Sequence, residues 1–461
     1  MSDLMTLVQG WLPGQRWYAG RGPATLRLLG SVSLADPLRE PGVRFITVAV
    51  LLDASTEPPV VYQVPLVIRT VDSHIDARGY IGSYATRSGR VAVVDGPHDP
   101  ALGRALLALV AGERTAVGPA GRRGAVAYGL SMPGSRIGRI RSSRVLQGEQ
   151  SNSSIVFETE DPDSGEQSPP LIMKIFRMLH GGEHPDATVQ AALTAGGSPR
   201  VPPSYGQVSA QWPDPREPGG RATGHLAFVQ EYFAGVEDAW RIALRASEAG
   251  EDFAAPARSL GRATAETHRA LREALPVAPP THERVRAVLE GMREQFGYAA
   301  RLVPALAERE ERAARVFAEA EGAQWAPFQR VHGDYHLGQV LAVPERGWVL
   351  LDFEGEPLRP LRDRNAPDQP ARDVAGMLRS FDYVAGVTSA RSWAQRARAA
   401  FLDGYLEELQ EASASRERGV DPRLLTAYEL NKAAYEIVYE ASCRPAWLHV
   451  PLGAAMRLLG R

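Results

Sequence analysis

Two short stretches decide the fold: Val331–Leu341, which reads VHGDYHLGQVL, and Leu351–Pro357, which reads LDFEGEP. In the first stretch Asp334 is followed five residues later by Gln339, and Asp352 comes 18 residues after Asp334. An isolated His-Gly-Asp is most often a turn in which the aspartate caps the backbone. Here apolar runs flank it and a second aspartate ends one of those runs, so the combination favours catalysis.

This spacing is typical of kinases. Protein kinases place a base aspartate, an amide-bearing metal ligand five residues later, and a second aspartate that holds magnesium on the nucleotide phosphates. Phosphoryl transfer needs a carboxylate near the attacking hydroxyl and hard oxygen ligands on the metal. We therefore interpret Asp334 as the base, Gln339 and Asp352 as Mg²⁺ ligands, and His332 as the residue that orients the loop.

Lysine is rare in this chain. Only Lys174 and Lys432 are lysines among the 52 basic residues, and every other one is arginine. The two could be accidental survivors, but arginine replaces lysine poorly where a compact ammonium meets a phosphate or a sugar. Lys174 lies in the apolar run 171–176, which is typical of a strand. Because a kinase carries a strand lysine that neutralises the nucleotide phosphates, we expect Lys174 to contact ATP.

The segments on either side of Lys174 supply the rest of the expected nucleotide site. The turn at 148–154 is predicted to lie over the phosphates, although a plain hairpin explains it about as well. The apolar strand 225–230 is predicted to lead into the linker whose backbone reads adenine. The residues expected at the nucleotide, besides Lys174, are Ser151, Asn152, Ser153, Gln230, Glu231 and Tyr232.

Hydrophobic periodicity predicts strands in the first half and helices in the second. We expect an α+β, bilobal, protein-kinase-like fold with three parts: an N-terminal strand-rich cap subdomain at 1–135, a nucleotide-binding small lobe at 136–233, and a helical C-terminal lobe at 234–461. Polar loops are predicted at 161–170 and 211–223, and a strand pair at 330–331 and 348–353. The other predicted strands are 43–52, 60–70, 140–147, 153–158, 171–176 and 225–230, and the predicted helices are 101–112, 257–275, 281–295, 302–320, 374–383, 390–410 and 422–439.

Composition excludes several classes of function. The 461 residues are 44% hydrophobic and 23% charged, which is ordinary for a globular enzyme of two or three domains. A formal charge of −2 gives no field that attracts nucleic acid or an anionic membrane. Cys443 is the single cysteine and cannot form an internal disulfide. With no secretory signal pattern and no apolar run long enough for a bilayer, we expect a cytoplasmic protein.

Over essentially its full length, the chain resembles the actinobacterial maltokinases, a family within the aminoglycoside phosphotransferase-like group. The resemblance rests on the two stretches quoted first, on WLP and QRW within 11–17, on DGPHDP at 95–100, on RDVAGMLRSFDY at 372–383, and on 431–451. It implies a kinase-like fold with an N-terminal cap, ATP and Mg²⁺ as cofactors, and transfer to the reducing-end O1 of maltose. The product, maltose 1-phosphate, would feed glycogen and α-glucan synthesis.

The resemblance also implies roles for individual residues. It gives the base, the metal ligands and the phosphate-contacting lysine the same residues as the spacing does. It also places Lys432, Tyr435 and Tyr439 where the family binds the disaccharide. The spacing agrees, because residues three and four apart share one face of a helix, although two core tyrosines would show the same pattern. Glu354 is expected beside the metal or the sugar. Alternatively, Glu354 or Glu356 pairs with an arginine, for which Arg359 and Arg379 are candidates.

One position departs from the family pattern, and one aspartate is given a structural rather than a catalytic role. Where the family usually has a glutamate that pairs with the strand lysine, this chain has Thr188, and the candidates to replace it are Glu183, Asp186 and Gln190. Asp373 is interpreted as the N-cap of the helix 374–383, with a second role bracing the catalytic loop also open.

Other functions stay open. A glucosamine kinase or another sugar kinase of the same fold is the nearest alternative, although LDFEGEP favours maltose. An antibiotic-modifying phosphotransferase is disfavoured, because a polycationic substrate needs a dense acidic rim. A non-catalytic nucleotide-binding regulator of trehalose or glycogen enzymes is a different class of alternative. The cap either docks a trehalose synthase-type partner or covers one side of the nucleotide lobe.

Overall fold

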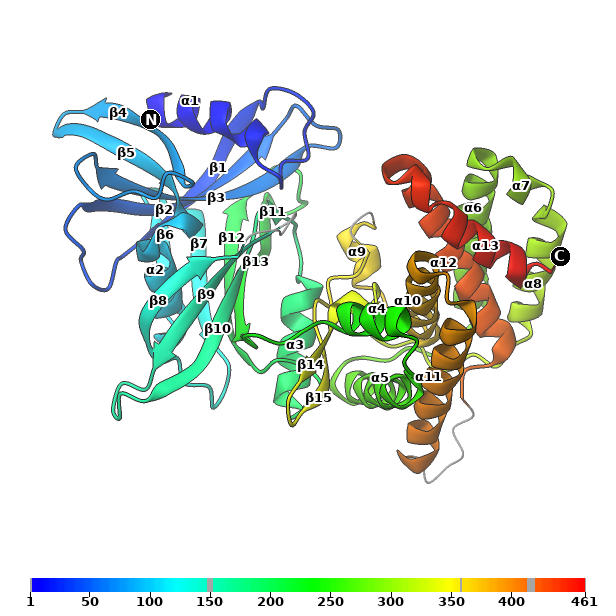
Figure 1. Cartoon of the computed structure of the whole chain (residues 1–461). Coiled ribbons are helices and arrows are strands. Elements are labelled where there is room, and N and C mark those ends of the chain that lie inside the picture. The colour runs from blue at the N-terminus through cyan, green and yellow to red at the C-terminus, as the bar shows by residue number, and fades with distance from the viewer. Residues whose placement is uncertain (1, 147–151, 357–358, 413–418, 461) are drawn as a thin grey trace. The chain divides into compact units, whose positions relative to one another are not determined.

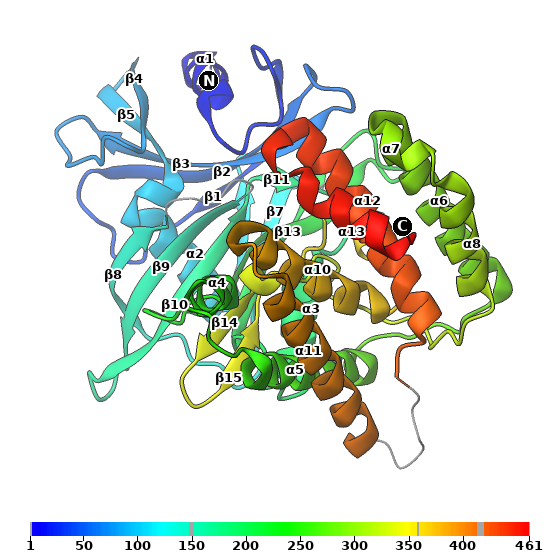
Figure 2. The same ribbon diagram turned by 45° about the vertical axis from the view of Figure 1, so that its right-hand side comes forward.

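The computed structural model describes residues 2–146, 152–356, 359–412 and 419–460 (Figure 1). Its contacts divide the chain into two compact units: a first unit of 1–191 with 202–234, and a second unit of 192–201 with 235–461. Each unit is described by itself. The first is rich in strands and the second is mainly helical, as Figure 2 also shows, which agrees with the predicted α+β class. The finer division into three domains stays a prediction.

The central strands of one antiparallel sheet of the first unit are buried on both faces. The order of this sheet is β1-β2-β3-β5-β4, and β11 also pairs with β3. Successive side chains of a strand point to opposite faces, so Val48 and Val50 of β2 join one core cluster while Ala49 and Leu51 join another. This confirms the predicted hairpin of 43–52 and 60–70. The elements are α1 (Ser2–Trp11), a 3₁₀ turn (Leu12–Gly14), β1 (Leu26–Leu34), β2 (Val43–Asp53), β3 (Val60–Thr70), β4 (Tyr80–Thr86), β5 (Gly89–Asp95) and β11 (Met178–Leu179).

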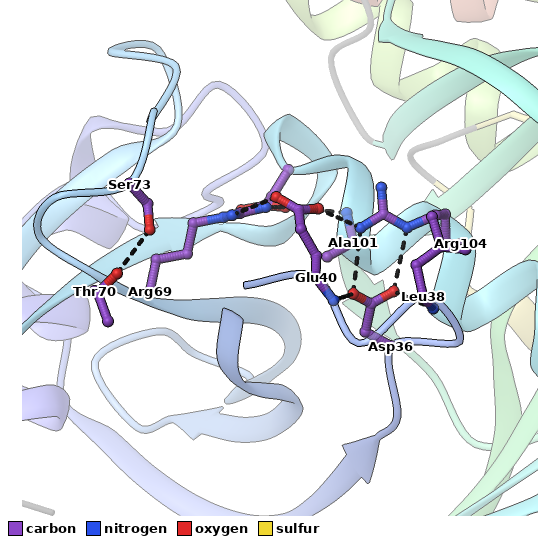
Figure 3. A network of polar contacts seen from close by, with 9 residues as sticks. Asp36, Leu38, Glu40, Arg69, Thr70, Ser73, Ala101 and Arg104 are labelled. Atoms are coloured by element: carbon purple, nitrogen blue, oxygen red, sulfur yellow. Dashed lines mark hydrogen bonds and ion pairs between the residues drawn. The ribbon is translucent and has the colours of Figure 1, made fainter. Parts of the chain in front are cut away.

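A chain of alternating charges fixes the loop before β2 (Figure 3). The buried guanidinium of Arg69 lies 2.7 Å from Glu40 and donates to Asp99 at 2.8 Å. Arg104 donates to both Glu40 and Asp36, and hydrogen bonds from the two arginines hold the pKa of Glu40 below its usual range despite partial burial. A buried guanidinium is tolerated only when it is paired in this way, so the network is structural.

A second antiparallel sheet of the first unit carries the strand lysine. Its order is β6-β7-β12-β13-β10-β9-β8. The predicted loops 161–170 and 211–223 are wrong in length, because cross-strand pairing continues to the ends of both hairpins. A register shift in β10 accommodates its two prolines. The elements are a 3₁₀ turn (Gly96–His98), α2 (Pro100–Ala111), β6 (Thr115–Gly118), β7 (Gly121–Ser131), β8 (Arg139–Val145), β9 (Asn152–Glu160), β10 (Gln167–Phe176), α3 (Pro185–Ala195), β12 (Ser204–Pro213) and β13 (Arg221–Glu231).

The second unit is built from packed helices. The backbones of α5 and α11 approach closely at two glycines, since a Cβ added at Gly261 would lie 2.0 Å from the Phe401 carbonyl oxygen and one at Gly404 2.0 Å from that of Arg258. No helix in the described part of the chain has the length and apolar character needed to cross a bilayer. The elements are α4 (Ala239–Ala249), α5 (Ala254–Ala274), α6 (His282–Leu302), α7 (Pro304–Ala307), α8 (Glu310–Glu321), a 3₁₀ turn (Leu337–Gln339), β14 (Val340–Val343), β15 (Gly347–Leu350), α9 (Leu361–Arg364), α10 (Ala371–Thr388), α11 (Arg391–Ala412), α12 (Pro422–Cys443), a 3₁₀ turn (Pro445–Trp447) and α13 (His449–Leu458).

Two sequence predictions fail in this unit. The single helix predicted over 302–320 is wrong. Leu302 ends α6, the extended Val303 and Pro304 start the short α7, and a turn at 308–309 separates α7 from α8, since Arg309 has a non-helical φ of −114° and ψ of 4°. The strand pair predicted at 330–331 and 348–353 is also wrong. The hairpin consists of β14 and β15, whose tight turn is made possible by left-handed φ angles of 65° at Glu345 and 75° at Gly347.

Candidate active site

Asp373 holds the backbone of the loop that carries Asp334. Its carboxylate accepts hydrogen bonds from the amides of His332 at 2.7 Å and Gly333 at 2.9 Å, and lies 3.0 Å from His268 Nε2. Burial alone would raise the pKa of Asp373, but the His268 contact, the charge of His332 and the Gly333 amide lower it. The predicted N-cap role is wrong, because α10 begins at Ala371 and the carboxylate points to the loop instead. The bracing role that the sequence left open is the one observed.

His332 connects the loop to the strand that precedes Asp352. Its Nε2 donates to the Leu351 carbonyl oxygen at 2.7 Å, and its ring packs against the rings of Tyr335 and Phe353. This geometry is the one expected for a residue that orients the loop. Its chemical role stays a proposal.

Gln339 and Asp352 lie side by side. The amide nitrogen of Gln339 donates to Asp352 Oδ2 at 3.1 Å, so one carboxylate and one amide group converge. Asp352 has a φ of 63°, a strained value for a non-glycine residue that is typical of functional sites. No group of three or more His, Cys, Asp or Glu able to hold a metal occurs among the described residues. Mg²⁺ fits this pair, since it takes one or two protein oxygens and completes its shell with phosphates and water.

Lys432 of α12 lies between two carboxylates. Its Nζ is 3.1 Å from Asp334 Oδ1 and 2.7 Å from Glu356 Oε1. Burial works against charge on both carboxylates, yet the nearby cations outweigh it and lower the pKa of Asp334 and of Glu356. Burial likewise disfavours the ammonium, but Glu356 and Asp334 raise the pKa of Lys432 far above its usual range. Asp334 is therefore an ionised acceptor at neutral pH.

The ion pairs continue beyond Glu356 to a buried arginine. Arg372 pairs with Glu356, donates to Asp368 at 3.0 Å and donates to the Gly333 carbonyl oxygen at 3.2 Å. Tyr428 donates to Asp368 at 2.7 Å. The sequence did not identify Arg372, Asp368 or Tyr428 as site residues. The available signal was the position of Arg372, directly before the bracing aspartate in a stretch already recognised as distinctive.

The two glutamates after Asp352 differ. Glu356 pairs with Arg372 and Lys432, so neither Arg359 nor Arg379 is its partner. The backbone carbonyl of Glu354 accepts from Arg364 at 3.3 Å, and the Glu354 carboxylate favours the charged form of that arginine, whose pKa is lowered by burial. A metal or sugar contact of Glu354 stays a prediction.

The two tyrosines predicted to bind sugar are not equivalent. The ring of Tyr435 lies 5.0 Å from Lys432 Nζ, and burial raises its pKa to about 12. Tyr439 is 39% exposed and lies 5.4 Å from the Arg444 guanidinium. A groove of about 580 Å³ runs along α6 and α12, and Tyr435 lines it whereas Tyr439 does not. The polar and aromatic residues of this groove nearest the network are Glu356, Asp368, Arg372, Tyr428, Asn431 and Tyr435.

In the first unit, Lys174 is held by Asp186. The two side chains are 2.7 Å apart, and Asp186 is fully buried at the start of α3. The ammonium also lies 5.9 Å from the centre of the Phe228 ring. Thr188, which stands where the family usually has a glutamate, donates to the carbonyl of His184, the residue directly before α3. Among the three candidates from sequence, Asp186 is the partner.

The predicted phosphate-covering turn is only partly described. Ser151 lies outside the described residues, as do the four residues before it. Asn152 and Ser153 begin β9, and the Ser153 hydroxyl accepts from Arg177 Nε at 2.8 Å. Arg177 also pairs with Asp95 at 2.7 Å. Ser153 is thus engaged inside the unit, and its phosphate contact stays a prediction.

The predicted adenine-reading segment ends β13. The amide of Glu231 donates to the Pro203 carbonyl at 2.9 Å, and the amide of Tyr232 donates to the Pro170 carbonyl at 2.7 Å. The side-chain oxygen of Gln230 is buried and makes no hydrogen bond within the described residues. Two of the backbone donors expected to read adenine are therefore already used inside the sheet.

Comparisons with known proteins define the class. The family described as "Maltokinase N-terminal cap domain" matches residues 11–99, and the "Phosphotransferase enzyme family" matches 220–419. Together with the strand-rich and helical units, these matches define an aminoglycoside phosphotransferase-like kinase that carries a maltokinase-type cap. Such kinases use ATP with Mg²⁺, which the pair of Gln339 and Asp352 fits, and this confirms the predicted cofactors.

Two curated relatives narrow the family to which the chain belongs. It is 32% identical over 290 residues to a glucosamine kinase of Streptacidiphilus jiangxiensis, a match that covers 58% of this chain and 64% of that protein, slightly under two thirds of its length. It is 30% identical over 341 residues to a glucosamine kinase of Mycolicibacterium smegmatis, with 69% of this chain and 80% of that protein covered. The chain belongs to the family of this second enzyme.

The fold of this chain is similar to that of a solved glucosamine kinase structure over nearly the whole length of both chains. The structure is that of a glucosamine kinase in complex with glucosamine, ADP and inorganic phosphate. The TM-score is 0.68 at 25% identity, and the superposition covers 99% of both chains. The predicted kinase-like fold is thereby confirmed.

Proposed function

We propose that this chain transfers a phosphoryl group from ATP to a hydroxyl group of a small sugar, and that the sugar is glucosamine. One observation carries the kinase proposal: Asp334 lies 3.1 Å from Lys432, whose charge lowers the pKa of that carboxyl group, on a loop braced by Asp373. A carboxylate in this state can accept the proton of an attacking hydroxyl group. The neighbouring pair of Gln339 and Asp352 supplies the metal ligands that this chemistry requires.

The roles of the residues follow from these contacts. Bound ATP with Mg²⁺ supplies the phosphoryl group and neutralises part of its charge. Asp334 orients the sugar hydroxyl and accepts its proton. Lys432 keeps Asp334 in its charged form and fixes its position, since the same ammonium is bound by Glu356. Lys174, positioned by Asp186, is proposed to contact the nucleotide phosphates.

Glucosamine is the first acceptor to test because of the relatives. Two kinases at 30% and 32% identity carry that name, and so does the solved structure whose fold covers 99% of this chain. The Tyr435 ring beside Lys432 offers a surface for the apolar face of a sugar ring, and the ammonium offers donors for hydroxyl groups.

Maltose is the second candidate. The match of residues 11–99 to the maltokinase cap favours it, together with the LDFEGEP stretch of the sequence. The groove of about 580 Å³ along α6 and α12 has room for more than one sugar ring. With maltose as acceptor, the product would be maltose 1-phosphate, a precursor for glycogen and α-glucan.

A coupled assay of ADP release tests both acceptors. The purified chain is given ATP and Mg²⁺ with glucosamine, maltose, glucose or no sugar, and Asp334→Asn serves as the inactive control. We expect glucosamine to give the highest kcat/KM. A higher kcat/KM with maltose would move the assignment to the second candidate. Turnover that no sugar stimulates would reject the kinase proposal and favour a nucleotide-binding regulator.

The cellular setting also stays a proposal. We propose a cytoplasmic enzyme, in keeping with its single cysteine, and a trehalose synthase-type partner that docks on the cap. The partner proposal belongs to the maltose alternative, because such a partner would supply maltose. Co-purification of the full chain with a trehalose synthase from the same cell tests it, and a chain that elutes alone would exclude the partner.

A further inference from the structure

A second cavity lies among the C-terminal helices of the second unit. It has a volume of about 670 Å³, is open on one side, and is lined by residues of α10, α11, α12 and α13, which lie next to one another in Figures 1 and 2. It shares no lining residue with the groove that contains Tyr435. None of the catalytic roles assigned above uses it. The charged and titratable residues that line it are Asp382, Arg391, Arg398, Glu429, His449 and Arg457.

The two carboxylates of this cavity are already paired. Asp382 Oδ2 accepts from Arg379 at 2.5 Å and from Arg457 at 2.8 Å. Glu429 accepts from Arg398 Nη2 at 2.7 Å. Because each carboxylate already has a guanidinium partner, neither offers a strong site for a cation.

The arginines, by contrast, have donors left over. Arg398 Nη1 is buried and makes no hydrogen bond within the described residues, although it lies 3.5 Å from Asp382 Oδ2. Arg391 is exposed at the rim and forms no ion pair in the described ranges. A buried guanidinium nitrogen that makes an ion pair at 3.5 Å but no hydrogen bond is poorly satisfied, so an acceptor supplied from outside the chain would stabilise it.

Small residues shape the rest of the wall. Gly453 and Ala454 line the cavity, and a Cβ added at Gly453 would meet nothing closer than Arg457 Nη1 at 3.8 Å, whereas Gly386 packs against Val450. Bidentate recognition of a phosphate by guanidinium groups is strong and geometrically specific. The volume exceeds what a phosphate ion alone requires and lies in the range of small-molecule sites.

We propose that this cavity binds a phosphorylated sugar, with the phosphate group on Arg391 and Arg398. The class of ligand follows from the excess of guanidinium donors and from the remaining volume, which suits a hexose. The proposal does not depend on which sugar is phosphorylated in the active site.

Isothermal titration calorimetry with glucose 6-phosphate tests the site. The full chain is titrated with ADP and Mg²⁺ present in saturating amounts, so that the nucleotide site is occupied. Arg391→Glu is the test variant, because Arg391 is exposed, forms no ion pair with any residue that the structure describes, and can be replaced with the core intact. Arg293→Glu, which changes an exposed arginine of α6 outside both cavities, is the matched control.

We expect the wild type and R293E to bind glucose 6-phosphate with equal affinity and R391E to bind about tenfold more weakly, the size expected for reversing one partly solvated charge beside a phosphate. Glucose without phosphate is expected not to bind there. Equal affinity of R391E and R293E, or no binding to the wild type, overturns the proposal. If inorganic phosphate binds as tightly as glucose 6-phosphate, the sugar makes no contact in the cavity, and the proposal that the ligand is a phosphorylated sugar is overturned.

Discussion

The two lysines of this chain lie in ion pairs that differ in what surrounds them. Lys174, in the first unit, is paired at 2.7 Å with Asp186, which is fully buried. Lys432, in the second unit, is shared between Glu356 at 2.7 Å and Asp334 at 3.1 Å, and Glu356 continues to Arg372. The first pair fixes the position of one ammonium group. The second pair also sets the protonation state of the proposed base.

This difference explains why a chain rich in arginine keeps a lysine at each place. At Lys432 a compact ammonium fits between two carboxylates, whereas the wide guanidinium fork would push them apart. At Lys174 the same compactness would let one group contact both Asp186 and a phosphate. The comparison therefore predicts that substitutions at the two lysines will change different kinetic constants.

The largest effect is expected at the base. Asp334→Asn removes the proton acceptor while keeping the size of the side chain, so kcat should fall by about 10³-fold, within the usual range for a general base. The KM for ATP should change little, because Lys174, Gln339 and Asp352 are untouched. Steady-state kinetics with ATP and the sugar measure both constants. A variant that keeps a tenth of the wild-type kcat would contradict the assignment of Asp334.

Lys174 comes second. Lys174→Met removes the charge proposed to face the phosphates and leaves Asp186 buried without its cation, so kcat/KM for ATP should fall by about 10²-fold. Lys174→Arg is the matched control that keeps the charge but not the shape, and its loss should be smaller. The KM for the sugar should stay the same in both variants. If only the KM for the sugar changed, Lys174 would contact the sugar rather than the nucleotide, and the proposed difference between the two lysines would be wrong.

Lys432 is expected to act through pH. Removing its charge in Lys432→Met raises the pKa of Asp334, so the acid limb of the profile of kcat/KM for the sugar should move to higher pH. Lys432→Arg keeps the charge and should move the limb less. A profile that does not move in Lys432→Met would mean that Lys432 does not set the charge of the base.

The same variant has an effect on stability with a definite sign. Asp334 and Glu356 have lowered pKa values in the folded chain, so their contribution is present above pH about 4 and is lost as pH falls through the folded values. Lys432→Met should therefore lower the free energy of unfolding at pH 7 by about 3 kcal/mol, and by less in acid. Urea unfolding at pH 7 and at about pH 3, below the unfolded pKa values, measures it, and an equal loss at both pH values would contradict the ion-pair explanation.

The smallest effect separates the two tyrosines. Tyr435→Ala should raise the KM for the sugar about fivefold, because its ring lines the groove beside Lys432. Tyr439→Ala is the matched control one turn along α12, and it should change the KM less than about twofold, since its exposed ring faces Arg444. Equal effects from both substitutions would restore the sequence prediction that both bind the sugar.

The sequence predicted the chemical groups of the site better than their partners. The spacing of Asp334, Gln339 and Asp352 indicated a kinase loop, and the structure brings Gln339 and Asp352 to 3.1 Å. For the ion-pair partner of Lys174, the sequence offers three candidate residues and does not choose among them. Which of the three faces the strand depends on where α3 begins. The predicted N-cap role of Asp373 fails for a similar reason. The sequence does not locate the start of α10 to within one turn, and the helix begins two residues before Asp373.

By itself, the sequence determined which charged groups exist and how far apart they stand along the chain, and that was enough to define the class of fold and chemistry. The tertiary structure decided which charges meet. Lys432 reaches Asp334 across 98 residues and Glu356 across 76, and Arg372 completes a network that no local pattern encodes. The physical reason is that buried charges must be neutralised by neighbours in space, and helix packing rather than sequence distance selects those neighbours.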